Sequence, residues 1–277
     1  MELHSMTCSN EMQLRLIIGH YFRQQMSASH PASITVITVV YNAAATVERT
    51  MVSVHDQTWP HVMHLVIDGA SNDDTLNIVH RYARHALKVK SEKDYGIYDA
   101  MNKGVSLATG DYIIFMNAGD EFYSNNVLEK MLEDDIDADI YYGNTMVVDD
   151  AGNELGDRRL HPPKALNWRS LRFGMCVSHQ SILVKRSICV DYDLTYKISA
   201  DIDWTIRVLK NAETVVNSNL YVAKFLIGGI SSSRRKEGLK ERFLIMTTHY
   251  GLFPTIINHI YITFRFVVHL FTKRSLT

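Results

Sequence analysis

The chain has 277 residues, of which 46% are hydrophobic and 21% are charged, and its formal net charge is −1. Such values are typical of a globular protein, with enough chain for one large domain of roughly 220–250 residues plus an appendage. The near-neutral charge argues against nucleic acid as a partner of the whole protein.

Three cysteines are spread along the chain, at Cys8, Cys176 and Cys189. Their number and spacing fit neither a disulfide framework nor a zinc site, which favours a reducing, cytoplasmic compartment. The first residues are polar and lack the apolar core of a signal peptide. Residues 1–30 are therefore expected to be an N-terminal extension of unreadable role.

The first half alternates short apolar runs with helical patterns. Strands are predicted at 33–41, 63–68, 87–89 and 112–116 because each run is apolar and too short for a helix. Between them, apolar residues recur near every 3.6 positions, as in a helix packed on one face. The βαβαβαβ order predicts a parallel, right-handed α/β sheet.

Polar clusters follow each predicted strand, at 41–42, 68–69, 92–94 and 117–120. The carboxyl ends of parallel strands share one edge of the sheet, where such folds bind ligands. The run 94–120 also combines a Gly-bearing loop with the start of a helix. This edge is therefore predicted to bind a phosphorylated ligand.

Two local signals suggest how helices begin and end. Ser71 is expected to cap the second helix, with Asp74 as the acid of its first turn. Gly110 is expected to adopt a positive φ after the third helix.

The alternation loosens in the second half, which predicts a mixed sheet. We expect a helix at 125–134 and a strand at 175–185. Between them, the run from Ile140 to Val148 and a turn at Gly152-Asn153 predict a hairpin. Two further helices are expected, one with Asp201 in its first turn and one from Lys236 to Tyr250 ended by Gly251.

The segment 252–271 is apolar and aromatic but interrupted by Asn258, His259, Arg265 and His269. These interruptions make it a poor membrane-spanning helix. A helix lying on a membrane surface and a helix packed on the core both fit the pattern.

Seven motifs occur in order: TVVYN, VIDGASNDDT, EKDYGIYDAMNKG, YIIFMNAGDEF, HQ, SAD and GGIS. Together they resemble family 2 glycosyltransferases with the GT-A fold, especially bacterial polysaccharide transferases of the colanic-acid type. The resemblance covers about 33–250 and implies a Rossmann-like, mostly parallel sheet flanked by helices, with mixed sheet in its second half. It divides the chain into a nucleotide-sugar half (31–123), an acceptor half (124–250) and a C-terminal apolar helical segment (251–277).

The resemblance implies a donor site in the first half. Carried over onto this chain, the residues that bind the nucleotide sugar are Thr38, Val40, Asn42, Asp68, Asp94, Gly96, Lys103, Asn117 and Gly119. Thr38, Val40 and Asn42 would line the nucleotide, Asp68 would hold base or ribose, and Lys103 would lie near the diphosphate.

The metal site implied by the family departs from the commoner pattern of two acids. The strand ends on Asn117-Ala118-Gly119-Asp120, so Asp120 is the expected ligand of Mn²⁺ or Mg²⁺. Such ions often use one or two carboxylates together with substrate phosphates.

On the acceptor side, the resemblance makes Asp201 the base, with Asp203 as the second candidate. A helix N-terminal acid with no catalytic role is the alternative for Asp201. His179 and Gln180 are expected to contact donor or acceptor, although a core histidine fits equally well. Gly228 and Gly229 are expected in a mobile loop over the site.

The resemblance thus implies an inverting glycosyltransferase that uses a nucleotide sugar, with UDP-sugars favoured. The acceptor would be a glycan or lipid-linked precursor in surface polysaccharide synthesis, reached in the cytoplasm or at the inner face of the plasma membrane. A non-catalytic nucleotide-sugar-binding member or an assembly scaffold is the alternative. A Rossmann oxidoreductase is disfavoured because no G-x-G-x-x-G follows the first strand.

Overall fold

The computed structural model describes residues 31–82, 87–133, 136–228 and 234–274. The predicted N-terminal extension and Gly229 lie outside these residues. The helices and strands are β1 (Ile34–Val40), α2 (Val47–His55), β2 (Val62–Asp68), α3 (Thr75–Arg81), β3 (Leu87–Ser91), α4 (Ile97–Leu107), β4 (Tyr112–Phe115), β5 (Glu121–Phe122), α5 (Val127–Met131), β6 (Ile140–Val148), β7 (Glu154–Asp157), η1 (Trp168–Phe173), η2 (His179–Ser181), β8 (Ile182–Lys185), η3 (Arg186–Ile188), α6 (Ala200–Asn211), β9 (Val215–Leu226), α8 (Arg235–Tyr250) and α9 (Leu252–Arg274).

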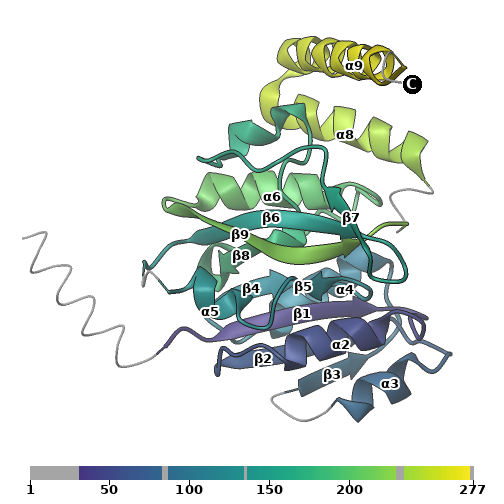
Figure 1. Cartoon of the computed structure of the whole chain (residues 1–277), viewed down its shortest axis with the longest axis vertical. Helices are drawn as coiled ribbons and strands as arrows, with labels where there is room; N and C mark the ends of the chain where they lie inside the picture. Colours follow the sequence, from purple (N-terminus) through teal and green to yellow (C-terminus); the bar gives the residue numbers. More distant parts are fainter. Residues whose placement is uncertain (1–30, 83–86, 134–135, 229–233, 275–277) are drawn as a thin grey trace, which may run out of the picture.

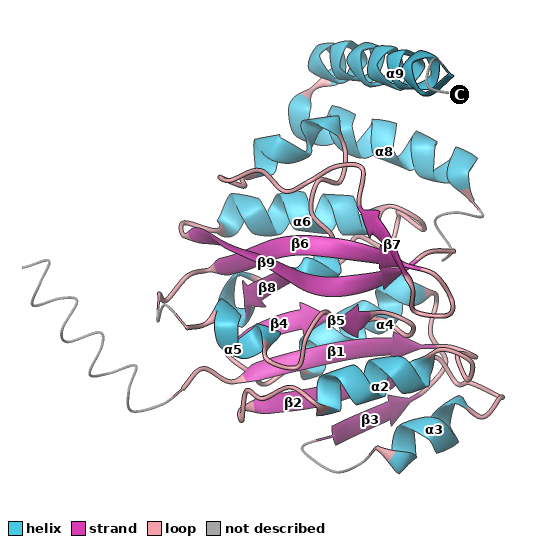
Figure 2. Ribbon diagram, viewed as in Figure 1, coloured by secondary structure: helices cyan, strands magenta, loops and turns pink. Residues whose placement is uncertain are grey.

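The described strands form one nine-stranded sheet in the order β3-β2-β1-β4-β8-β6-β9-β5, with β7 paired to β6 (Figures 1 and 2). The four strands β3, β2, β1 and β4 are parallel, as the sequence predicts. From β8 onward most pairs are antiparallel, although β6 and β9 run parallel. The predicted α/β class with a mixed second half is therefore confirmed.

The sheet is covered on both faces, which explains why its strands are apolar throughout. On β1, Ile37 and Val39 face one core with Met101 of α4, while Ile34 and Val36 face another with Val54 of α2. Alternate residues of a strand point to opposite faces, so a strand buried on both sides has no polar stripe.

Two predictions about helix ends are wrong. The second helix begins at Thr75 rather than after Ser71, and Asp73 accepts the Thr75 backbone N–H at 3.0 Å, while the Ser71 hydroxyl accepts a bond from Asn42. Gly110 has no positive φ; it is small because a side chain there would collide with the backbone of β1. A position can require glycine either for a positive φ or for close approach to another backbone, and the second reason applies to Gly110.

The predicted strand 175–185 is shorter than expected. Only Ile182–Lys185 is strand, and His179 to Ser181 form the 3₁₀ turn η2 that leads into it. The helix predicted at 125–134 is also short, at Val127–Met131. The hairpin of β6 and β7 and the end of α8 at Gly251, which has φ +87°, agree with the predictions.

Helices α8 and α9 lie at one end of the molecule, beyond α6 and far from β3 (Figure 1). Within the described residues, neither these nor any other helix combines the length and the hydropathy that crossing a bilayer requires.

Candidate active site

The end of β4 meets two segments from the second half of the chain. The Asn117 amide lies 3.1 Å from Nε2 of His179, and Nδ1 of His179 lies 3.9 Å from the Asp201 carboxylate. Asp120 accepts a hydrogen bond at 2.7 Å from Gln180 Nε2. Five residues predicted to share a site are thus brought together, although up to 84 positions separate them in the chain.

Asp201 stands at the start of α6, and 27% of its side chain is exposed. The hydroxyl of Tyr98, from α4, lies 3.5 Å from its carboxylate and donates to the Ile198 carbonyl at 2.9 Å. Burial lowers the pKa of His179 to about 4, so its imidazole is neutral near pH 7. The carboxylate therefore faces solvent beside a neutral ring and a helix N-terminus, which suits a proton acceptor.

Asn117 supplies an open acceptor within this cluster. Its Oδ1 is buried, and among the residues described here no group donates a hydrogen bond to it. A buried polar atom without a partner is uncommon and suggests an ordered water or a ligand hydroxyl.

Asp120 is held inside the protein rather than at the surface. Its two oxygens accept hydrogen bonds from Gln180 Nε2 and, at 3.0 Å, from the Leu226 backbone N–H. Burial raises the pKa of Asp120 to about 7, although both donors act in the opposite direction. This carboxyl ties β4 to η2 and to the end of β9.

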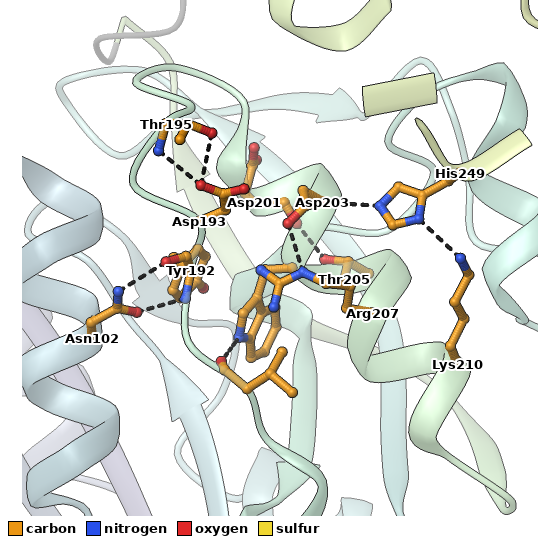
Figure 3. Close-up of polar contacts among 12 residues, drawn as sticks. Asn102, Tyr192, Asp193, Thr195, Asp201, Asp203, Thr205, Arg207, Lys210 and His249 are labelled. Atoms are coloured by element: carbon orange, nitrogen blue, oxygen red, sulfur yellow. Dashed lines mark hydrogen bonds and ion pairs between the residues drawn. The ribbon is translucent and has the colours of Figure 1, made fainter. Parts of the chain in front are cut away.

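Asp203 faces a different neighbour. One of its oxygens lies 2.8 Å from His249 Nε2 of α8, and the other accepts from Arg207 Nε at 2.7 Å, as Figure 3 shows. Residues two apart on a helix do not share a face. The side chain therefore joins α6 to α8, which favours Asp201 over Asp203 as the base.

The remaining predicted donor residues gather at the carboxyl ends of β1 to β3. Asp68 is buried and accepts from the Ser71 backbone at 3.1 Å and from the Ser91 hydroxyl at 2.6 Å. Asn42, in the left-handed region at φ +47°, accepts from the Asn72 backbone. These loops are thus held together by side chain to backbone bonds.

Asp94 and Lys103 flank the start of α4. Asp94 accepts from the Gly96 backbone at 2.9 Å, and Gly96 has φ +118°. Lys103 lies 3.2 Å from Glu92 and 3.3 Å from Asp99, so its charge is already balanced by two carboxylates.

Three predicted residues offer little surface for a ligand. The side chains of Thr38 and Val40 are buried, and the Thr38 hydroxyl donates to the Met116 carbonyl at 2.8 Å. Gly119 has φ +100°, and a side chain there would collide with Leu226. Gly228 is exposed with φ +109° and open space around it.

Residues 35–191 match the family described as glycosyl transferase family 2. The chain belongs to this family. It is 29% identical over 235 residues to the PGL/p-HBAD biosynthesis glycosyltransferase of Mycobacterium tuberculosis, covering 80% of this chain and 88% of the relative. It is also 26% identical over 220 residues to the putative teichuronic acid biosynthesis glycosyltransferase TuaG of Bacillus subtilis, covering 76% and 86%.

Solved structures share the GT-A fold with this glycosyltransferase. The S. aureus TarS fragment 1-349 in complex with UDP-GlcNAc superposes with a TM-score of 0.65 at 18% identity. The match covers 77% of this chain and 65% of the TarS fragment, so the chain spans less than two thirds of that fragment. The mannosyltransferase PcManGT from Pyrobaculum calidifontis, in complex with GDP-Man and Mn²⁺, superposes with a TM-score of 0.61 at 16% identity. This match covers 88% of this chain and 76% of PcManGT.

GT-A glycosyltransferases commonly use a divalent metal, but the residues here fit a protein-held ion poorly. Both Asp120 oxygens already accept hydrogen bonds, and the adjacent Glu121 lies 3.7 Å from Arg49. In the described part of the chain no three His, Cys, Asp or Glu side chains converge as a metal site would need. Hard cations bind groups of oxygen ligands, which this strand end does not offer.

Two residues of this region were missed in the sequence. Glu241 of α8 accepts hydrogen bonds from the backbone N–H groups of Lys197, Ile198 and Ser199 at 2.7–2.9 Å, just before α6 begins. Arg158 follows β7, and its guanidinium carbon lies 5.9 Å from the centre of the Phe225 ring. Neither residue stands in a local motif, so only the folded chain reveals them.

Replacing Asp120 with asparagine is expected to change how stability depends on pH. Because folding raises this pKa from 3.8 to about 7, the folded chain binds the proton more tightly. The resulting stabilisation is complete below the unfolded pKa and is lost as pH rises through about 7, by about 4 kcal/mol at most. Urea unfolding from pH 4 to pH 8 should show this loss in the wild type relative to Asp120→Asn.

The matched control for that measurement is Glu121→Gln, which also removes one carboxylate at the same strand end. Its unfolding free energy should follow the wild-type pH dependence. Parallel pH curves for Asp120→Asn and the wild type would show that Asp120 titrates in the folded protein as it does in the unfolded chain.

Replacing Glu241 with glutamine is expected to loosen the loop before α6. The amide keeps one acceptor oxygen where the carboxylate has two, and bonds to a charged group are each worth about 1.5–3 kcal/mol. Hydrogen exchange at residues 197–199 should accelerate at least tenfold, and Glu237→Gln, one turn earlier on the same helix, should leave it unchanged. Equal protection in both variants would contradict the role of Glu241.

Proposed function

We propose that this glycosyltransferase transfers a sugar with inversion from a nucleotide sugar, with UDP-sugars favoured, to a hydroxyl of a glycan or lipid-linked acceptor. The observation that carries the proposal is the partly exposed Asp201 carboxylate beside the His179–Asn117 pair. Residues 31–123 would supply the donor side and residues 124–250 the acceptor side.

The donor would lie along the carboxyl ends of β1, β2 and β4. Asp68 and Asn42 hold the loops that would contact base and ribose. Asp94 accepts a hydrogen bond from Gly96 just before α4, and this loop would lie near the diphosphate. The TarS complexes with UDP-GlcNAc and UDP support a nucleotide sugar as the ligand of this fold. Thr38 and Val40 would contribute through backbone, since their side chains are buried.

In the proposed reaction Asp201 accepts the proton of the acceptor hydroxyl. The resulting oxygen attacks C1 of the sugar as the bond from C1 to the diphosphate breaks, and the electron pair leaves with the phosphate oxygen. Attack opposite the leaving group inverts the configuration at C1. His179 stays neutral and fixes the orientation of Asn117, whose open Oδ1 would accept a donor hydroxyl.

The residues present fit a protein-held Mn²⁺ or Mg²⁺ ion poorly, so no step of the proposed reaction is assigned to the metal. Asp120 would serve as a buried tie between strands rather than as the ligand expected from the sequence, because its oxygens are occupied.

The acceptor is proposed from the relatives, whose names assign them to PGL/p-HBAD biosynthesis and to teichuronic acid biosynthesis. A surface polysaccharide precursor would fit, used in the cytoplasm or at the inner face of the plasma membrane. Helix α9 supports a peripheral membrane site, because Phe253, Ile257, Ile260 and Phe264 are 65–79% exposed. Spaced by four, three and four residues, they form one apolar stripe.

Replacing Asp201 with asparagine should lower the rate of transfer by roughly 10²–10⁴-fold, because the base is lost. A screen of UDP-, GDP- and dTDP-sugars by thermal stabilisation would first identify the donor. Affinity for that donor should change little, and Asp191→Asn, an exposed acid ten residues earlier, should retain activity. Wild-type turnover in Asp201→Asn would refute the proposed base.

A non-catalytic nucleotide-sugar-binding role is favoured by one observation, the single acid at the end of β4. The same screen separates the two functions. Donor stabilisation without hydrolysis or transfer would support the binding role, whereas turnover of any of these donors would exclude it.

Replacing Phe253 and Ile257 together with glutamate should abolish binding to anionic vesicles in a sedimentation assay. Burying a large apolar side chain is worth about 1.5–3 kcal/mol, and an acid also repels the anionic surface. Val52→Glu, a comparable change on α2, is the control. Unchanged binding, or loss of a dimer in place of vesicle binding, would contradict the membrane proposal.

A further inference from the structure

The carboxyl end of β4 leaves the donor's diphosphate without an evident counter-charge on the protein. Lys103 is balanced by Glu92 and Asp99, and Asp120 is a buried acid rather than a metal ligand. Leaving-group charge is a large part of the barrier to transfer, so a preorganised cation is expected near the site.

Arg158 is placed where such a cation is needed. It directly follows β7, and Asp157 is anchored by the Tyr221 hydroxyl at 2.6 Å. The guanidinium lies over Phe225 of β9, whose neighbour Leu226 donates its backbone N–H to Asp120. Strand pairing and the aromatic contact therefore hold the cation beside the end of β4.

Its electrostatic neighbours come from several elements of the site. Burial dominates the pKa values of Asp120, His179 and Cys176, and the Arg158 charge acts on all three. Burial also lowers the pKa of Arg158 itself, against the attraction of the Asp201 carboxylate. The cation thus lies within electrostatic reach of both Asp120 and Asp201.

The Arg158 guanidinium remains available to bind a ligand. No hydrogen bond or ion pair within residues 31–82, 87–133, 136–228 and 234–274 engages it at contact distance. A second cation, Arg242 of α8, lies near enough to lower the pKa of Arg158 further. A like charge nearby makes an unpaired guanidinium less favourable, which favours an anionic ligand at Arg158.

We infer that Arg158 binds the diphosphate of the nucleotide donor and stabilises it as the leaving group, in the role that a metal held by paired acids has elsewhere. This inference deepens the proposed function and rests on it. Planar guanidinium groups bind phosphate oxygens through two parallel N–H bonds, which gives both charge and direction.

The test compares Arg158→Met with the wild type by calorimetric titration in buffer containing EDTA. The probes are inorganic pyrophosphate, and UDP, GDP and dTDP with their monophosphates. Arg158→Met should bind pyrophosphate and the preferred nucleoside diphosphate about tenfold or more weakly, because a charge-assisted pair is lost. Its affinity for the monophosphate should fall less.

Two further variants keep the result interpretable. Arg158→Lys keeps the charge without the planar fork and should recover part of the affinity. Arg159→Met removes the adjacent, exposed arginine and should bind like the wild type. Thermal melting of each variant shows that it is folded.

The outcomes separate this inference from the proposed function. Wild-type protein that binds none of the nucleotides overturns the nucleotide donor, and the pyrophosphate arm still tests Arg158. If Arg158→Met binds pyrophosphate and the nucleoside diphosphate as tightly as the wild type does, the inference is overturned and the proposed function is not affected. Wild-type binding that vanishes in EDTA and returns with Mn²⁺ also overturns it, since the metal then supplies the charge.

Discussion

The buried carboxyl of Asp120 is the interaction on which the rest of the site depends. It lies at the end of a central parallel strand and accepts hydrogen bonds from η2 and from the end of β9. These elements stand 60 and 106 positions away in the chain, so one acid fixes the second half of the protein against the first. A buried acid is costly unless its oxygens are satisfied, and here both are.

That constraint determines which chemistry remains for the other residues. Because Asp120 holds η2 in place, His179 reaches both Asn117 and the neighbourhood of Asp201. Asp120 is buried and each of its oxygens already accepts a hydrogen bond, so it is poorly placed to bind a ligand. In our proposal the positive charge that faces the diphosphate comes from Arg158 after β7, whose charge acts on Asp120, His179 and Asp201.

The sequence predicts the parallel half well because its signal is local. Uninterrupted apolar runs indicate strands buried on both faces, and the polar residues after them mark one edge of the sheet. Asn117, Asp120, His179, Gln180 and Asp201 were identified through the ordered motifs, and the fold brings them together. The apolar pattern at 175–185 predicts strand at His179, where the structure has a 3₁₀ turn, because three residues carry no periodicity that distinguishes the two.

Glu241 and Arg158 show why the remainder of the site could not be predicted. Each acts through contacts with segments distant in the chain, and charged residues on a helix or after a strand are usually solvated. The same limit explains Gly110, since the sequence shows a glycine but not the β1 backbone packed against it. The roles of Glu241, Arg158 and Gly110 all depend on contacts with distant parts of the chain. A short window of sequence carries no information about such contacts.

Helix α6 connects the chemistry to the C-terminal helices. One face of its first turn presents Asp201 to the site, while Asp203 on another face meets His249 of α8. Glu241, also on α8, holds the backbone just before Asp201 through three bonds. A displacement of α8 would therefore move the loop that sets the position of Asp201, the proposed base. Helix α9 follows α8 directly and carries an exposed apolar stripe. Contacts made by that stripe would therefore be transmitted through α8 to the backbone just before Asp201.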